Sequence, residues 1–326
     1  GDEFIAGRKL YGGSINQFTH AFKNFGWNVV WADNDDVASF ERALTPKTKA
    51  IFVESIANPG GIVTDLAAIS AIAKEAGVPL IVDNTLATPY LIRPIEHGAD
   101  IIVHSLTKFL GGQGNSIGGV IVDCGTFDWL KSGRYPTMSE PSPSYHGVTF
   151  AETFGNFAFA IAARVFSLRD LGPAISPFNA FLILNGIETL PLRMQRHCDN
   201  ALVVAEWLSG HPKVEWVNYA GLPGNAYHAL ARRYCRSGAG AVFTFGLKGG
   251  YEAGVKLVSN VQLFSHLANI GDTRSLIIHP ASTTHRQLPD DARARAGAGP
   301  EVVRLSIGLE DVGDIIADLD HALAGL

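Results

Sequence analysis

The side chains that could do chemistry together lie in two short polar segments of this chain, one around Asp83 and one around Lys108. Each segment directly follows an apolar run, residues 80–82 and 101–103, which predicts a buried parallel strand. Open α/β sheets bind ligands at the carboxyl ends of their strands. We therefore expect the polar side chains that follow these strands to share one site: Asp83, Thr85, Ser105, Thr107 and Lys108.

The residue types in these segments suggest carbonyl chemistry. A lysine that is removed from water can lose its proton and form a Schiff base, which is the role we expect of Lys108. An aspartate such as Asp83 can keep a pyridine nitrogen protonated, and the hydroxyl groups of Ser105 and Thr107 can bind a phosphate. Together these groups match the requirements of pyridoxal 5'-phosphate (PLP). The structural alternatives are a solvated lysine on a loop and an aspartate that caps a helix or turn.

Residues nearer the N-terminus add candidate cofactor ligands. Glu54 ends a further apolar run, residues 50–53, and either supports the cofactor site or faces solvent. Asn58 and Thr85 can hydrogen-bond the phenolic oxygen of the cofactor, although Asn58 before a proline is equally typical of a turn. Tyr11, which precedes two glycines, can stack on a planar ring and supply a phenol for proton transfer; taken alone, it is a core or turn tyrosine.

Arg304 is a charged residue among apolar neighbours in the C-terminal part of the chain. A guanidinium can hold a carboxylate through two parallel hydrogen bonds, so Arg304 is a candidate for binding the carboxylate of a substrate. The alternative is a structural salt bridge.

Two other motifs do not indicate a site. The glycine-rich residues 111–119 lack the Gly-Lys-Ser/Thr ending of a phosphate-binding P-loop and lead into a strand instead of a helix. His279 and His285 do not have the spacing of metal ligands, and no carboxylate completes a site, so we expect no bound metal.

The elements that must position these residues alternate between strand and helix. Apolar positions at helical spacing predict a helix beginning at Leu66, capped by Thr64 or Asp65 and ended by Gly77, between two strands. Such a βαβ unit predicts a parallel sheet. Residues 128–145, rich in Pro, Ser and Tyr, predict a long loop.

We therefore predict an α/β fold in which residues 1–187 form a large, mostly parallel domain and residues 188–326 a smaller C-terminal α+β domain. The second domain should contain a helix to residue 208, strands at 214–217 and 241–245, and a final amphipathic helix.

Length and composition set the class of protein. The chain has 326 residues, 47% of them hydrophobic, which suffices for about two domains at the usual size of roughly 150 residues each. The net charge of −5 without a block of one sign argues against nucleic acid as a partner, and no apolar run is long enough for a membrane span. Three cysteines without ligand spacing are typical of reduced thiols in a cytoplasmic protein.

Taken together, these segments resemble the Cys/Met-metabolism family of fold-type I PLP enzymes. The resemblance runs along the whole chain and includes Leu10-Tyr11-Gly12-Gly13, Glu54–Pro59, Asp83–Tyr90, Ser105–Phe109, Pro191–Met194, Phe264–Asn269, His279–His285 and Arg304–Glu310. It implies the aspartate aminotransferase-like fold, with a mostly parallel sheet of the seven-stranded type. It also implies a homotetramer built from dimers, with active sites at the dimer interface.

The same resemblance implies roles for the candidate residues. Lys108 would carry the cofactor, Asp83 would bind its pyridine nitrogen, and Tyr11 would stack on its ring. Ser105 and Thr107 would hold the phosphate. Arg304 would bind the α-carboxylate of an amino-acid substrate, with Asn269 nearby.

The insert at residues 127–147 favours the O-acetylhomoserine sulfhydrylase branch of the family. That branch implies γ-replacement, in which O-acetyl-L-homoserine and sulfide give L-homocysteine and acetate for methionine biosynthesis. A cystathionine γ-synthase or a methionine or cystathionine γ-lyase is the alternative, because these enzymes share every cofactor residue.

The sequence departs from the family at its beginning. Gly1 is not an initiator Met, and the family's N-terminal segment, which supplies backbone amides to the phosphate and a Tyr-x-Arg to the neighbouring subunit, is not found. We expect the native N-terminus to be missing and a chain of this length to bind PLP poorly. An inactive fragment or a non-catalytic relative is therefore a further alternative. A smaller departure is Gln113, where related sequences often carry His.

Overall fold

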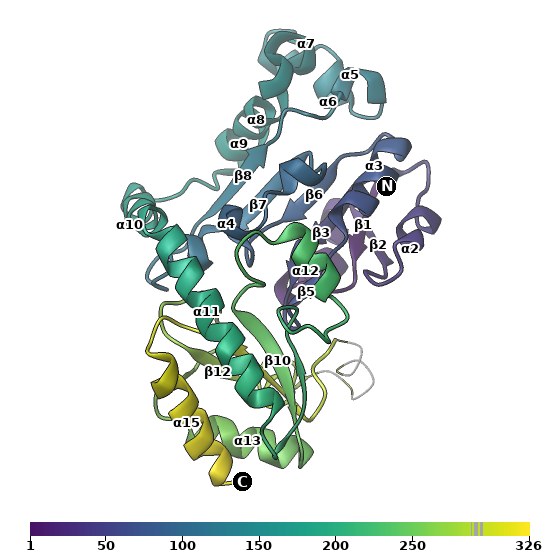
Figure 1. Ribbon diagram of the computed structural model, residues 1–326. Coiled ribbons are helices and arrows are strands. Elements are labelled where there is room, and N and C mark those ends of the chain that lie inside the picture. The colour runs from purple at the N-terminus through teal and green to yellow at the C-terminus, as the bar shows by residue number, and fades with distance from the viewer. Residues whose placement is uncertain (288, 290–292, 294–295) are drawn as a thin grey trace.

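A six-stranded sheet forms the centre of the N-terminal part of the chain (Figure 1). The computed structural model describes residues 1–287, 289, 293 and 296–326. Within them the strand order is β2 (Asn28–Ala32), β1 (Glu3–Gly7), β3 (Thr48–Glu54), β6 (Leu80–Asp83), β7 (Ile101–Ser105) and β8 (Gly119–Asp123). Neighbouring strands are parallel except β7 and β8. The mostly parallel sheet is confirmed, whereas the described residues contribute six strands to it instead of the expected seven.

The central strands are buried because their side chains are apolar on both faces. Ile51, Val53, Leu80 and Val82 are fully buried, as both faces of a parallel sheet covered by helices require. The pairing of β3 with β6 sets Glu54 directly beside Asp83. The register of these strands therefore brings two carboxylates together at the carboxyl edge of the sheet.

The predicted βαβ unit is confirmed. Helix α3 (Leu66–Ala76) joins β3 to β6, and the Asp65 side chain accepts a hydrogen bond of 3.3 Å from the Ala68 amide. Gly77 ends the helix with φ +66°, a conformation that glycine adopts without steric cost.

The segment at residues 128–145 is not a plain loop, so that expectation is wrong. It contains helices α5 (Trp129–Ser132) and α6 (Pro136–Ser139) and a 3₁₀ turn at Pro143–Tyr145. Trp129 packs parallel to the ring of Phe159 at 5.5 Å between centroids. Tertiary packing of aromatic rings has overridden the loop-forming composition.

The remaining helices frame the central sheet or connect it to the C-terminal part. The α-helices are α1 (Gly12–Asn16), α2 (Ala38–Arg42), α4 (Thr88–Leu91), α7 (Phe150–Phe154), α8 (Ala158–Ala162), α9 (Arg169–Leu171), α10 (Pro177–Glu188), α11 (Leu190–Ser209), α12 (His228–Tyr234), α13 (Gly250–Asn260) and α15 (Val312–Ala324). Short 3₁₀ or π turns lie at Gln17–Ala21, Phe22–Phe25, Pro94–His97, Leu106–Leu110, Gly155–Phe157, Ala163–Leu168 and Pro280–Ser282.

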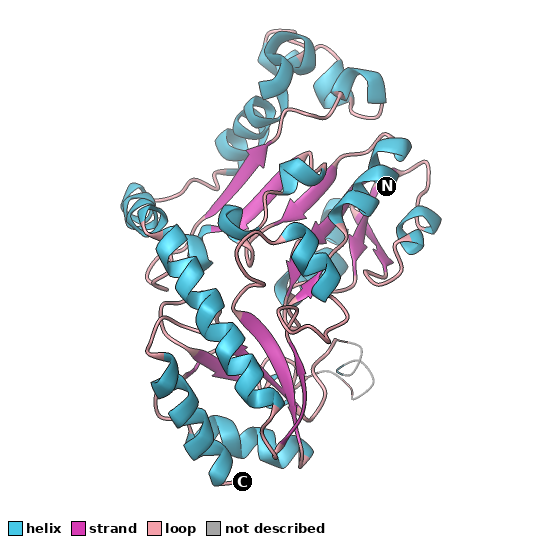
Figure 2. Ribbon diagram, viewed as in Figure 1, coloured by secondary structure: helices cyan, strands magenta, loops and turns pink. Residues whose placement is uncertain are grey.

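A second, mixed sheet forms the C-terminal part (Figure 2). Its order in the described residues is β11 (Ser265–His266), β12 (Leu276–Ile278), β13 (Val302–Ser306), β10 (Val242–Leu247) and β9 (Val214–Asn218), and a two-stranded ribbon, β4 (Ile56–Ala57) with β5 (Ile62–Val63), lies apart from both sheets. Helix α11 extends from α10, beside the central sheet, to the C-terminal sheet (Figure 1). The smaller mixed C-terminal sheet is confirmed, and the domain boundary between residues 187 and 188 stays a prediction.

Two findings bear on the excluded classes. Among the described residues, none of the helices is both long and apolar enough to cross a membrane. In the same part of the chain, no group of three or more His, Cys, Asp or Glu side chains is arranged to hold a metal ion. His279 instead makes structural contacts, because its ring nitrogens lie 2.9 Å from the Ser282 hydroxyl and 2.9 Å from the Pro300 carbonyl oxygen.

Candidate functional site

Two adjacent carboxylates end the neighbouring strands β3 and β6. Glu54 is only 3% exposed, and its pKa rises to about 8 because it is buried and because it lies beside Asp83. Burial also raises the pKa of Asp83, while the amide of Thr85 donates a hydrogen bond of 2.9 Å to its carboxylate and opposes that rise. Neither carboxylate forms an ion pair with a Lys or Arg of the described residues.

Glu54 also fixes two loops of the site. One carboxylate oxygen accepts a hydrogen bond of 2.7 Å from the Tyr11 amide, and the other accepts one of 3.1 Å from the Asn58 amide. Of the two readings of Glu54, support of the site is favoured over exposure to solvent. The Tyr11 side chain is 56% exposed, and its ring lies so close to Gly13 that a Cβ there would be 2.3 Å from the ring.

Thr85 ties the ends of β6 and β7 together. Its hydroxyl accepts a hydrogen bond of 2.8 Å from the Ser105 amide. The Thr107 hydroxyl contacts the backbone of Gly118 through its amide at 3.2 Å and its carbonyl at 3.3 Å. The expected phosphate contacts of Ser105 and Thr107 stay predictions.

Lys108 lies in the tight turn Leu106–Leu110 that follows β7, with backbone angles outside the helical region, φ −93° and ψ −135°. Its ammonium group contacts the side-chain oxygen of Asn269, which belongs to the C-terminal part of the chain. Burial lowers the pKa of Lys108, and the charge of Arg304 lowers it further. The structure thus places Lys108 where an uncharged amine is favoured, with Asn269 as its direct partner.

Arg304 lies on β13 and is 9% exposed. Its guanidinium donates hydrogen bonds to the side-chain oxygen of Asn58 at 3.0 Å and to the backbone oxygen of Asn269 at 2.9 Å. Burial lowers its pKa to about 10. Because both acceptors are neutral and no carboxylate of the described residues pairs with it, the structural salt bridge considered above is not formed.

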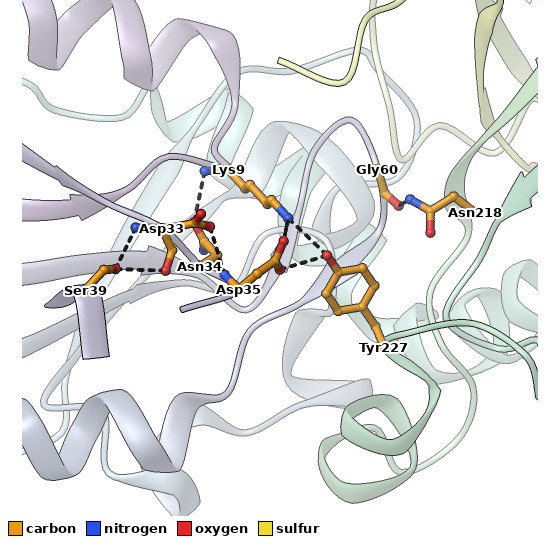
Figure 3. A network of polar contacts seen from close by, with 8 residues as sticks. All are labelled: Lys9, Asp33, Asn34, Asp35, Ser39, Gly60, Asn218 and Tyr227. Atoms are coloured by element: carbon orange, nitrogen blue, oxygen red, sulfur yellow. Dashed lines mark hydrogen bonds and ion pairs between the residues drawn. The ribbon is translucent and has the colours of Figure 1, made fainter. Parts of the chain in front are cut away.

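A polar network holds the loop that carries Tyr11 (Figure 3). Lys9 forms an ion pair with Asp35 and donates a hydrogen bond of 3.0 Å to the Tyr227 hydroxyl, which donates one of 2.8 Å to Asp35. Nearby, the Asn218 side chain donates to the Gly60 carbonyl at 3.1 Å. Residues 218–227 of the C-terminal part thus fix both loops that meet at Glu54.

The residues present fit a planar cofactor with a basic ring nitrogen and an amino-acid substrate. Asp83 is a buried carboxylate without a cationic partner in the described part of the chain, and a protonated pyridine nitrogen would supply one. Arg304 is a buried cation whose partners among the described residues are neutral oxygens, and a substrate carboxylate would supply an anion. Lys108 lies beside Arg304 with an amine of lowered pKa. The segments that carry the ten candidate residues are thus connected to one another by the hydrogen bonds and strand pairings given above.

The sequence reasoning assigned no role to Arg193. This buried side chain on α11 donates hydrogen bonds to the carbonyl oxygens of Phe109 and Leu110, directly after Lys108. The available signal was a cation on the apolar face of a helix that also buries Met194, His197 and Cys198.

Comparisons with known proteins agree over the whole chain. Residues 1–324 match the family described as Cys/Met metabolism PLP-dependent enzyme. The chain is 52% identical to an O-acetyl-L-homoserine sulfhydrylase of Leptospira meyeri, covering 100% of this chain and 76% of the relative. It is 51% identical to O-acetyl-L-homoserine sulfhydrylase 1 of Thermus thermophilus, covering 99% and 77%.

A solved structure is similar at the level of the fold. It is the crystal structure of a putative O-acetylhomoserine (thiol)-lyase from Campylobacter jejuni that contains N'-pyridoxyl-lysine-5'-monophosphate. The TM-score is 0.95 at 41% sequence identity, and the match covers 99% of this chain and 77% of the other.

Proposed function

Because the chain belongs to the Cys/Met metabolism family of PLP-dependent enzymes, we propose that it replaces the acetoxy group of O-acetyl-L-homoserine with sulfide. The products are L-homocysteine and acetate, and the reaction serves methionine biosynthesis. The names and the identities of the relatives support this choice over the other reactions of the family.

The cofactor supplies an electron sink that makes protons near the substrate amino group acidic. Lys108 would hold it covalently, and Asp83 would hold the proton on its ring nitrogen. Tyr11 would cover the ring, while Ser105 and Thr107 would bind the phosphate, and Thr85 and Asn58 would lie at its phenolic oxygen. The order of these residues along the ends of β3, β6 and β7 supports this arrangement.

Proton transfer would be the second role of Lys108. Its lowered pKa leaves more of the amine uncharged near neutral pH than for a solvated lysine, so it can accept a proton from the substrate and return it to a neighbouring carbon. Arg304 would bind the α-carboxylate and thereby orient the amino acid, and Asn269 contacts both Lys108 and Arg304. The Tyr11 phenol, which is exposed to solvent, would assist departure of acetate.

The observation that carries the proposal is the pair of unbalanced buried charges. Within the described residues Asp83 has no cationic partner and Arg304 has no anionic partner, so the site matches ligands that bring the opposite charges in. A structural network would be expected to join these charges to each other.

Incubation with PLP, O-acetyl-L-homoserine and sulfide tests the proposal, with homocysteine and acetate as measured products. We expect homocysteine to form only when sulfide is present. The Lys108→Ala variant should form none. The control Lys256→Ala removes an exposed lysine of α13 and should behave like the wild type. Ketobutyrate formed without sulfide would assign the γ-lyase reaction instead. No product in either case would favour a non-catalytic relative.

We also propose assembly as a homotetramer. Support comes from large apolar side chains that are exposed on α10 and β8, among them Phe178, Phe181, Leu184 and Ile121, because monomers rarely expose such groups together. Sedimentation velocity measures the assembly, and a monomer at micromolar concentration would contradict it.

The free thiols of Cys124, Cys198 and Cys235 support a cytoplasmic location.

A further inference from the structure

Arg193 is a buried cation of α11 that the proposed reaction does not use. Its side chain is 8% exposed and forms four hydrogen bonds. The guanidinium donates to the carbonyl oxygens of Phe109 at 2.8 Å, Leu110 at 3.2 Å and Gly186 at 2.6 Å, and to the Thr189 hydroxyl at 3.1 Å. All of these acceptors are neutral, so within the described residues the side chain is fixed by three carbonyls and one hydroxyl and not by an ion pair.

The acceptors of Arg193 lie at the end of the turn that carries Lys108. Within this turn the Leu106 carbonyl accepts from the Gly111 amide at 2.9 Å and the Lys108 carbonyl accepts from the Gly112 amide at 2.7 Å. The last carbonyls of any helical turn have no partner inside it. Arg193 supplies the partners for the two carbonyls that follow Lys108, and therefore fixes where the turn ends.

This turn also packs closely against α10 and α11. Gly112 has φ +77°, and a Cβ built on it would lie 2.2 Å from the guanidinium of Arg193. A Cβ on Gly186 would lie 2.1 Å from the Gly111 carbonyl oxygen, so α10 contacts the same segment from its side. Two glycines thus allow α10 and α11 to approach the backbone behind Lys108.

His197, one helical turn after Arg193, links the same turn to β13. Its ring meets the ring of Phe109 edge to face, 5.1 Å between centroids, and its Nδ1 lies 2.6 Å from the Ile307 carbonyl oxygen. Ile307 directly follows the strand that carries Arg304. One face of α11 therefore contacts the backbone next to both Lys108 and Arg304.

We propose that Arg193 is a positioning residue that sets the location of the Lys108 amine relative to Arg304 through the backbone carbonyls of Phe109 and Leu110. This inference rests on the proposed role of Lys108 as the residue that holds the cofactor. Because its guanidinium donates only to neutral oxygens of the described residues, three of them backbone carbonyls, we expect Arg193 to act through geometry and not through charge.

Lysine at position 193 separates geometry from charge. Its single ammonium keeps the charge but cannot reproduce the planar fork that reaches three carbonyls. Arg193→Lys and Arg193→Met should therefore both displace Lys108, whereas an effect of charge alone would be rescued by lysine. Arg196→Met is the matched control, since Arg196 is exposed on the same helix and contacts the Glu310 carbonyl at 3.3 Å. Leu319→Ala, at a buried position of α15, controls for lowered stability.

The full chain is freed of cofactor and incubated with PLP at a series of pH values, then reduced with borohydride. Peptide mass spectrometry measures the rate at which Lys108 acquires the pyridoxyl group. We expect both Arg193 variants to react roughly 10- to 100-fold more slowly, the loss typical of a reacting group misplaced by up to an ångström. We also expect the pH midpoint of the reaction to shift in both variants. Arg196→Met and Leu319→Ala should retain the wild-type rate and midpoint.

Steady-state kinetics gives the second measurement. The variants should lose kcat while the KM for O-acetyl-L-homoserine changes less, because Arg193 does not contact Arg304. Wild-type rates and pH midpoints in both Arg193 variants, or equal losses in Leu319→Ala, would overturn the inference. A wild-type chain that labels at Lys108 but forms no homocysteine would contradict the proposed reaction, and the labelling rates would still decide the role of Arg193.

Discussion

Glu54→Gln should remove a pH dependence from the folding stability of the cofactor-free chain. Glu54 is buried at the end of β3 beside Asp83, and no Lys or Arg of the described residues pairs with it. A carboxyl group in such a place favours its neutral form. The folded state therefore binds a proton that the unfolded state has already released, and this difference makes stability depend on pH.

The magnitude follows from the two pKa values. Burial and the neighbouring Asp83 raise the pKa of Glu54 from 4.5 to about 8. Since one pKa unit corresponds to about 1.4 kcal/mol, the full effect on unfolding free energy is at most about 5 kcal/mol. Because the pKa is higher in the folded state, this contribution is fully present below pH 4.5 and is lost as the pH rises through about 8.

Gln cannot ionise, so the variant should lack this contribution to the pH dependence. At pH 5 the variant should be less stable than the wild type by about 1–3 kcal/mol, because the amide of Gln can accept from only one of the Tyr11 and Asn58 amides. Near pH 9 the difference should shrink or reverse.

Urea unfolding at pH 5, 7 and 9 measures this, with Glu75→Gln, an exposed position on α3, as the control that keeps the wild-type dependence. If the unfolding free energy of Glu54→Gln changed with pH in the same way as that of the wild type, the reasoning would be refuted.

Two further variants probe the charges of the site and the loop network. Arg304→Lys should weaken competitive inhibition by L-norvaline by about 10- to 100-fold, since a hydrogen bond to a charged group contributes roughly 1.5–3 kcal/mol. Inhibition by n-butylamine, which lacks the carboxylate, should not change, and an equal loss for both would argue against a carboxylate contact. Tyr227→Phe, which removes the bonds to Lys9 and Asp35, should lower the unfolding free energy by about 1–2 kcal/mol in urea titrations. Tyr251→Phe should be neutral, and a neutral Tyr227→Phe would show that the network carries no stability.

The residues at the carboxyl edge of the central sheet were predictable because short apolar runs in the sequence identify buried strands and where they end. Apolar runs followed at once by Asp83 and by Ser105 identify strands and the residues at their carboxyl ends. The cap of α3 was predictable for the same reason, since Asp65 and Gly77 are signals of helix ends. The predicted βαβ unit already made the strands of Glu54 and Asp83 neighbours, whereas the register that sets the two carboxyl groups side by side comes from the structure.

Contacts between distant parts of the chain were not predictable from local patterns. Asn269 contacts Lys108, and Arg304 bonds to Asn58, across long stretches of sequence. Periodicity reports which face of an element is buried, but not which element covers it. Arg193 shows the same limit, because its place on α11 indicates burial while its backbone partners lie in another part of the chain.

The buried charges of this site lower the stability of the folded chain and, for the same reason, favour the binding of ligands with the opposite charges. Each buried charge that lacks a partner costs folding free energy, and in the described part of the chain the site retains two such groups of opposite sign, Asp83 and Arg304. The chain does not neutralise them against each other. Asp83 faces Glu54, a second carboxyl group, and Arg304 lies near Lys108, a second basic group, so neither neighbour supplies the opposite charge. Ligands that bring a cation to the first pair and an anion to the second therefore gain free energy that the folded chain alone cannot. This arrangement favours binding of the cofactor's positively charged ring nitrogen beside Asp83 and of the amino acid's carboxylate beside Arg304.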